Sequence, residues 1–389
     1  MIKSIRVMLL PNNKQNTKLF QCAGVSRWAY NWALTKEKEN YKSKNKFVQD
    51  GDLRKELTQL KKTDEFNWIN DYSCDIPKQA IKDACIAYQR FFKGQANFPK
   101  FKSRKKSNPS FYQDNFKIQV LERKVYLSNI GWIKLSERNR LPIGKGKTKE
   151  ISVVNPRITY DGIHWWISVS TELEDVLLPS TNQGLGIDIG IKDLAICSDG
   201  NIYKNINKTN TIKKIEKKKR RLQRKISKKY LKYKKGECCC KTSNIIKSEK
   251  QLLKITHRLT NIRHNYLHQV TNEIIKRKPS FIVLEDLDVK GMMKNKHLAK
   301  AIQEQCFYEF YNQLQYKCEY NNIKFIEADR WFPSSKLCSA CGCIKKDLKL
   351  SDRIYICPEC GNTIDRDYQA ALNLYNYGLN ELGKINNIA

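Results

Sequence analysis

The strongest constraint on the fold is one acidic residue, Asp188, inside the apolar stretch 185–200, which reads LGIDIGIKDLAICSDG. The apolar residues around it predict a buried strand, and Gly190 and the Ser-Asp-Gly at 198–200 predict a bend and a second strand that a turn closes. A carboxylate inside an apolar strand is costly to desolvate unless a cation meets it. Asp188 is therefore expected either to hold a metal or to pair with a base such as Lys192, and this stretch leaves both open.

Two further acids lie in comparable positions. Glu285 ends the apolar run 281–285, FIVLE, which follows Pro279 and predicts a second buried strand. Asp367 lies near the start of the helical pattern 365–378, and helix N-termini favour anions. Three carboxylates from separate elements can together hold two divalent metals, which activate water in phosphodiester hydrolysis.

The charge of the chain indicates a polyanionic partner. Lysine and arginine number 73 against 39 aspartates and glutamates among 389 residues, a formal net charge of +34 that is spread along the chain. Nucleic acid is the first candidate partner, and an anionic membrane surface is the rival. A genome that favours lysine codons would also raise the lysine count. We find neither an apolar run of about 18 residues nor a signal peptide, so a cytoplasmic protein is expected.

The N-terminal half predicts strands around helices. Residues 2–10 resemble a strand that Pro11 ends, and 15–48 and 75–92 carry helical patterns. Short β-rich runs between 111 and 174 suggest a small barrel or curled sheet, which the first strand could complete, leaving the helices as an insertion. The segment 98–111 interleaves aromatic with basic residues, either for nucleic-acid contact or as a solvated loop. Its candidate contact residues are Lys100, Lys102 and Arg104.

The densest basic segment is 213–235, with fourteen basic residues and a single acid, Glu216. Its apolar residues keep a helical spacing, and like charges this dense repel one another unless phosphates neutralise them. Nucleic-acid contact is preferred to a solvated helix. The candidate contact residues are Lys217, Lys218, Arg220, Arg221, Arg224, Lys225 and Lys228. Three cysteines at 238–240 follow with a spacing that fits no usual zinc site. A second long amphipathic helix is predicted before Glu285.

Two C-x-x-C pairs form the sharpest local signal. Cys338 and Cys341 are separated by fifteen residues from Cys357 and Cys360, and a glycine follows each pair. This spacing predicts a four-cysteine zinc ribbon, in which a closed set of four thiolates makes the zinc structural. The ribbon falls between the second and third acids, so we interpret it as an insertion in the domain that carries them.

Together these motifs resemble TnpB, the transposon-encoded family related to the type V CRISPR effectors. The resemblance covers nearly the whole chain and includes FPKFKSRKK, GIDIGIKDLAICSDG, VLEDLDVKGMMKN, FPSSKLCSACG and CPECGNTIDRDYQAALN. It implies a multidomain α/β protein with an RNase H-like (RuvC-like) nuclease domain at 181–389 and a zinc-ribbon insertion at 330–363. It further implies a β-barrel wedge domain at 1–14 and 98–180, with a helical recognition lobe at 15–97.

The resemblance also implies the site, the activity and a nucleoid-associated location in a prokaryotic cell. The metal-binding acids fall on Asp188, Glu285 and Asp367, with Asp365 as the competing third acid. Gln369 stands where the family commonly has asparagine. The expected function is RNA-guided, magnesium-dependent DNA cleavage, in which a transposon-derived guide RNA pairs with double-stranded target DNA and zinc is structural. The alternatives are a nuclease-inactive RNA-guided DNA-binding or transposition accessory protein and a guide-independent nuclease such as a junction resolvase.

Overall fold

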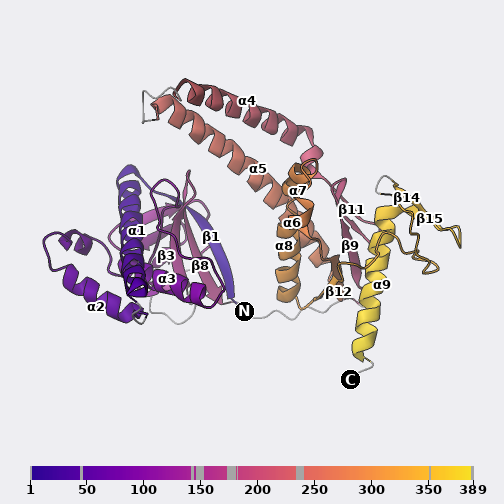
Figure 1. The fold of residues 1–389 in the computed structure, drawn as a ribbon, viewed down its shortest axis with the longest axis horizontal. Helices are drawn as coiled ribbons and strands as arrows, with labels where there is room; N and C mark the ends of the chain where they lie inside the picture. Colours follow the sequence, from indigo (N-terminus) through magenta and orange to yellow (C-terminus); the bar gives the residue numbers. More distant parts are fainter. Residues whose placement is uncertain are drawn as a thin grey trace. The chain divides into compact units, whose positions relative to one another are not determined.

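The computed structural model describes residues 2–43, 47–141, 144–145, 153–172, 181, 183–233, 241–349 and 352–386. The chain forms two compact units, residues 1–174 and 175–389 (Figure 1). The cysteines at 238–240 lie outside the described residues. No helix in the described ranges combines the length and the apolarity that a bilayer crossing requires.

An antiparallel sheet of eight strands forms the centre of the first unit, in the order β2-β7-β8-β1-β5-β4-β3-β6. The predicted first strand is β1, and it lies between β8 and β5. Strand β8 lies within the β-rich region predicted over 111–174, and every second residue from Trp165 to Thr171 is buried. Closure of this sheet into a barrel remains a prediction. The strands are β1 Ile2–Leu10, β2 Ser110–Tyr112, β3 Gln119–Leu121, β4 Lys124–Leu127, β5 Gly131–Leu135, β6 Gly144–Lys145, β7 Val153–Tyr160 and β8 Trp165–Glu172.

The helices of this unit share one hydrophobic core with the sheet. Helix α1 begins directly after β1, because Asn12 and Gln15 form a reciprocal capping box at 2.8 and 3.0 Å. The helix predicted over 75–92 is confirmed as α3. The helical elements are α1 Asn13–Lys42, α2 Asp50–Leu60, η1 Asn67–Asp71, α3 Asp75–Phe92 and η2 Asn115–Lys117.

The second unit contains a mixed sheet of five strands in the order β11-β10-β9-β12-β13. Strands β9, β10 and β11 pair antiparallel, whereas β12 pairs parallel to both β9 and β13. The strands are β9 Leu185–Ile189, β10 Asp193–Cys197, β11 Ile202–Lys204, β12 Phe281–Glu285 and β13 Lys324–Ala328. Two short strands, β14 Ile354–Ile356 and β15 Thr363–Asp365, form a separate hairpin.

Both faces of the five-stranded sheet are covered, which explains the continuous apolar run of β12. Ile282 and Leu284 face a core made with α5 and α8, while Phe281 and Val283 face a core made with α9. The long helices α4 and α5 lie side by side as an antiparallel hairpin (Figure 1). The helical elements are η3 Ile206–Lys208, α4 Asn210–Tyr233, α5 Ser243–Lys276, α6 Val289–Met292, α7 Ala299–Gln305, α8 Phe307–Tyr320 and α9 Arg366–Asn386.

Candidate active site

The three acids singled out in the sequence line one cleft of about 730 Å³ in the second unit. Asp188 lies one residue before the end of β9, and Glu285 ends β12. The parallel register pairs Leu284 with Ile187, so the two acids lie next to each other at the carboxyl ends of adjacent strands. Asp367 reaches the same cleft from the first turn of α9, which packs against both strands.

Asp188 is not paired with a cation in the part of the chain that the structure describes. Within the described residues, neither a hydrogen bond nor an ion pair reaches its carboxylate, although the side chain is only partly exposed. Lys192, the pairing partner considered above, also lines the cleft, but among the described residues neither a hydrogen bond nor an ion pair joins its side chain to that of Asp188. Burial, together with the carboxylates of Glu285 and Asp367, raises the pKa of Asp188 well above its usual range. A cation entering the cleft would therefore meet no competing ion pair from the described residues at this carboxyl group.

Glu285 is held by a residue from outside the sheet. The Ser334 hydroxyl donates a hydrogen bond to its carboxylate. Burial raises the pKa of Glu285, while the Ser334 hydrogen bond and the charge of Arg366 oppose that rise. Ser334 precedes the first C-x-x-C pair, and Asn373 of α9 donates to its carbonyl oxygen at 2.7 Å. The segment leading into the ribbon thus orients the Glu285 side chain.

The two aspartates at the start of α9 have different surroundings. The Asp365 carboxylate accepts the backbone N–H groups of Asp367 and Tyr368 at 3.0 and 3.1 Å, so Asp365 is the N-cap of the helix. The Asp367 carboxylate faces the cleft, and the Arg353 guanidinium lies 3.8 Å away. These positions favour Asp367 over Asp365 as the third acid of the cleft.

The acids do not converge as the cysteines do. Among the described residues, the cysteine set is the only group of three or more candidate ligands whose ligand atoms all lie within 4.8 Å of one another. Asp188, Glu285 and Asp367 line the cleft without forming so close a group. Their donor chemistry nevertheless suits a hard divalent cation such as Mg²⁺, which prefers carboxylate oxygens.

The cysteine cluster is the predicted Cys338, Cys341, Cys357 and Cys360. Sulfur atoms meet across the two pairs at 3.6 Å for Cys338 and Cys360 and at 3.5 Å for Cys341 and Cys357. The glycine after each pair, at 342 and 361, has a positive φ of 77° and 68°, which lets the backbone turn tightly around the cluster. Cys343 is not part of the set. Four thiols this close are the ligand set of a structural tetrathiolate zinc site.

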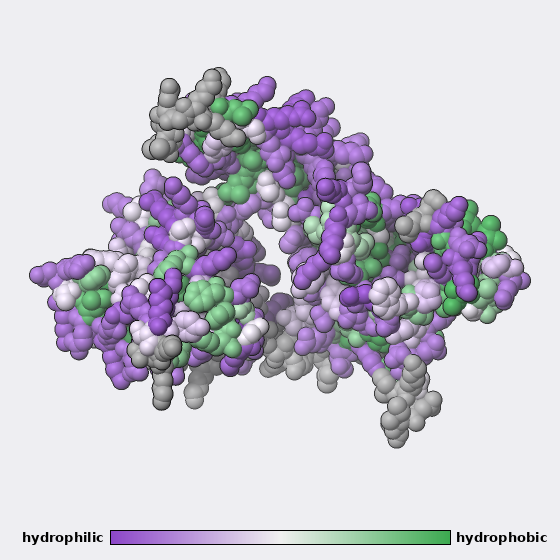
Figure 2. All heavy atoms as spheres, in the orientation of Figure 1, coloured by the Kyte–Doolittle hydropathy of each residue, from purple (hydrophilic) through white to green (hydrophobic). Residues whose placement is uncertain are grey.

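The predicted basic helix is α4, and its candidate contact side chains all point outward. Ile212 and Ile226 are buried, while Lys217, Lys218, Arg221, Arg224, Lys225 and Lys228 are exposed. Arg220 is exposed as well, but pairs with Glu216 at 3.5 Å. Hydrophilic residues cover much of the visible face of the α4–α5 hairpin in Figure 2. In the first unit Lys100 and Arg104 are exposed, whereas the Lys102 ammonium lies 3.8 Å from the ring centroid of Tyr30.

Several residues of the cleft were not predicted from the sequence as site residues. Ser334, Arg353 and Arg366 line it, yet a serine and two arginines are ordinary in so basic a chain. They become apparent only through contacts: Arg366 donates to the carbonyl oxygen of Lys349 at 2.9 Å, which fixes a guanidinium at the mouth of the acidic cleft.

Three family models match parts of the chain: a helix-turn-helix domain of IS605 OrfB over 1–46, a probable transposase, IS605 OrfB, over 168–296, and a Cas12f1-like TNB domain over 307–374. The cysteine cluster lies in the last of these. The match over 1–46 covers β1, α1 and the first residues that follow.

Two relatives resemble the chain over most of its length. One, from Escherichia coli K12, is named "Putative RNA-guided DNA endonuclease InsQ" and is 28% identical over 96% of this chain and 91% of its own. The other, from Streptomyces pristinaespiralis, is named "Putative RNA-guided DNA endonuclease" and is 29% identical over 97% of this chain and 89% of its own. Among solved structures, a chain of the cryo-EM Cas12f1-sgRNA-target DNA complex aligns with a TM-score of 0.61 at 15% identity, over 92% of this chain and 82% of that chain. The fold is therefore shared with that effector.

Proposed function

Because this chain carries the domains of the TnpB/IS605 OrfB transposase family, we propose that it is an RNA-guided DNA endonuclease encoded by a transposon. The observation that carries the proposal is the cleft that Asp188, Glu285 and Asp367 line together, with the Asp188 carboxylate free of any ion pair in the described structure. A cleft of this kind is suited to phosphodiester hydrolysis.

The acids fit a pair of magnesium ions by the chemistry of their donors. Asp188, Glu285 and Asp367 would hold the ions, and bound Mg²⁺ supplies an activated water and stabilises the leaving oxygen. Other residues of the chain prepare the acids for this role. Ser334 fixes the orientation of Glu285, and the cap by Asp365 fixes the helix turn that presents Asp367. Zinc in the cysteine cluster would hold the segment that carries Ser334.

The basic surfaces are proposed to hold nucleic acid. A guide RNA delegates sequence reading to base pairing, so the protein needs positive surfaces for the backbones more than contacts to bases. The exposed cations of α4 are candidates for such contacts, and those around 98–104 are a second set. We assign residues 181–389 to an RNase H-like nuclease domain with the ribbon at 330–363. The order β11-β10-β9-β12-β13, with β12 parallel to both β9 and β13, supports this assignment. In this proposal 1–14 with 98–180 form the wedge domain and 15–97 the recognition lobe.

The test is cleavage with and without Asp188. The chain is expressed with the transposon end that flanks its gene, and the RNA that copurifies is sequenced. A plasmid library matched to that RNA should then be cut in Mg²⁺ and left intact in EDTA. Asp188→Ala should abolish cleavage while RNA and target binding stay within about twofold, because binding rests on the basic surfaces.

The outcomes separate the alternatives. Defined RNA and specific target binding without cleavage would indicate the nuclease-inactive binder. Cleavage that needs no copurifying RNA would indicate a guide-independent nuclease. Wild-type cleavage by Asp188→Ala would refute the nuclease site itself.

A further inference from the structure

A chain of buried and partly buried polar side chains connects the base of the α4–α5 hairpin to the loop that follows Asp188. The loop is 190–192, between β9 and β10, and it lines the acidic cleft. All three of its carbonyl oxygens accept a hydrogen bond from a side chain. The donors are Gln305 to Gly190 at 2.8 Å, Asn205 to Ile191 at 2.8 Å and Lys208 to Lys192 at 2.6 Å. Hydrogen bonds at every carbonyl of so short a loop fix the backbone next to a carboxylate.

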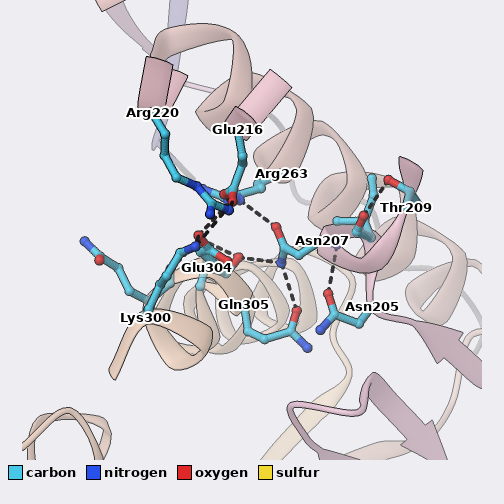
Figure 3. A network of polar contacts seen from close by, with 12 residues as sticks. Asn205, Asn207, Thr209, Glu216, Arg220, Arg263, Lys300, Glu304 and Gln305 are labelled. Carbon is cyan, nitrogen blue, oxygen red and sulfur yellow. Dashed lines mark hydrogen bonds and ion pairs between the residues drawn. The ribbon is translucent and has the colours of Figure 1, made fainter. Parts of the chain in front are cut away.

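Gln305 is the most enclosed of these three donors. It ends α7, is 3% exposed, and is followed by Cys306 in the left-handed conformation at φ 55°, where α8 begins. Its oxygen accepts from the Asn207 amide at 3.3 Å, and its nitrogen donates to Gly190. Figure 3 shows Gln305 and Asn207 facing each other beneath Arg263. A buried amide with both ends bonded has one orientation.

The direction of these bonds is set by Arg263 of α5. A guanidinium can only donate, so the Asn207 oxygen must face it, and the two groups lie 2.7 Å apart. The Asn207 amide nitrogen therefore faces Gln305 and the carbonyl oxygen of Glu304, the latter at 2.9 Å. The Gln305 oxygen is then occupied, which leaves its nitrogen for Gly190. Each bond in the series follows from the one before.

Arg263 is in turn held by acids from two helices. Its guanidinium contacts Glu216 of α4 at 2.9 Å and Glu304 of α7 at 3.5 Å, and Arg263 and Glu216 are each 13% exposed. Lys300 bridges the same two acids at 3.3 and 3.5 Å (Figure 3). Charges this far from solvent persist only when paired, so the cluster has a defined arrangement. The basic hairpin thus begins at the cluster that fixes Gln305.

We infer that Gln305 is a positioning residue for DNA cleavage: oriented by Arg263 and Asn207, it holds the Gly190 carbonyl and thereby the backbone that carries Asp188 into the cleft. This inference rests on the proposed function for its effect on cleavage, but not for its effect on the loop. The group it positions lies two residues before Gly190. A displacement of about 1 Å at a reacting group can cost 10²-fold in rate.

The test uses two substitutions at position 305 and one matched control. Gln305→Glu keeps the shape and can still accept from Asn207, but an ionised carboxylate cannot donate to Gly190. Gln305→Met keeps the volume with neither function, so it guards against poor folding of the Gln305→Glu protein. Gln303→Glu is the control, because Gln303 lies on the same helix with its side chain exposed.

Two readouts are measured on the full chain with its copurified RNA. In single-turnover cleavage, both variants at position 305 should lose about 10- to 100-fold in the rate at saturating target, with target affinity within about twofold. Amide hydrogen exchange of a peptide covering 188–194 should quicken in both, while Gln303→Glu matches the wild type. The melting temperature of each variant shows whether unfolding explains the change.

The inference would be overturned if both variants at position 305 kept the wild-type hydrogen exchange in 188–194 and the wild-type cleavage rate. An equal loss of cleavage rate in Gln303→Glu would overturn it as well. If the wild-type complex cuts no DNA, the proposed function fails while hydrogen exchange still decides the positioning role. The two failures are therefore distinguishable.

Discussion

Replacing the two aspartates at the start of α9 one at a time tests whether they have the separate roles that their contacts indicate. Asp365→Ala removes a helix cap, and Asp367→Ala removes a carboxylate from the cleft. The two residues are alike in type and two positions apart, so each variant is the control for the other. The expected results are opposite in stability and in activity.

The magnitudes follow from the contacts. Asp365 accepts the backbone N–H groups of Asp367 and Tyr368, and removal of such a cap costs about 0.5–2 kcal/mol. In a unit of this size, a destabilisation of about 1 kcal/mol lowers the melting temperature by roughly 2–4 °C. Asp367 forms one long ion pair with Arg353, whose side chain is 55% exposed, so its removal should change stability by less than about 0.5 kcal/mol. Its removal also relieves repulsion on Asp188.

Cleavage should show the reverse order. Metal ions supply several kcal/mol of transition-state stabilisation, and losing about 4 kcal/mol lowers a rate roughly 10³-fold. Asp367→Ala should therefore lose at least that factor, while Asp365→Ala should stay within about tenfold of the wild type. The assay is single-turnover cleavage of a guide-matched plasmid at a temperature well below both melting points. An inactive Asp365→Ala beside an active Asp367→Ala would refute the assignment of the third acid.

Three further outcomes are expected from the described contacts. The purified protein should contain about one zinc per chain, which Cys338→Ser should remove, and full occupancy in that variant would contradict the tetrathiolate site. Replacing Arg221, Arg224 and Lys228 together with glutamate should weaken RNA binding. The slope of the logarithm of the binding constant against the logarithm of salt concentration should fall by about one for each phosphate that α4 no longer neutralises. An unchanged slope would exclude α4 from the RNA interface. Gly186→Ala should lower the free energy of unfolding by roughly 1–3 kcal/mol and slow cleavage, because a β-carbon there would lie 2.2 Å from the Ala371 carbonyl oxygen of α9. Wild-type thermal stability in this variant would show that α9 can shift to make room for the methyl group.

The elements that the sequence predicted best are those whose signal is local. The run FIVLE is apolar at consecutive positions because β12 packs on both faces, and the helix over 75–92 follows one apolar stripe. The zinc spacing is local too, since each cysteine pair closes within one turn. Barrel closure and the domain boundaries in the first half depend instead on pairings between distant strands, and these pairings leave no period in the sequence.

The contacts that prepare the cleft depend on distance along the chain. Gln305 and Gly190 are 115 residues apart, and Ser334 reaches Glu285 across 49. Glutamine and serine are common residues, and neither has a spacing that points to a partner. The same limit applies to Asp188. The apolar residues around it predicted its buried strand, but whether its carboxylate pairs with Lys192 or holds a metal could not be decided without the contacts of the two side chains.

The hydrogen bonds of the loop 190–192 bear directly on that choice. Lys192 is the last residue of this loop, whose three carbonyl oxygens all accept hydrogen bonds from side chains, so the backbone between it and Asp188 is fixed. The described residues contain no bond between the two side chains, although both line the cleft. Pairing them would require the Lys192 side chain to fold back over a loop held at three points. An incoming cation meets no such cost. The fixed loop therefore favours a metal over Lys192 as the partner of Asp188. The same hydrogen bonds that hold the loop keep the Asp188 carboxylate open to the cleft.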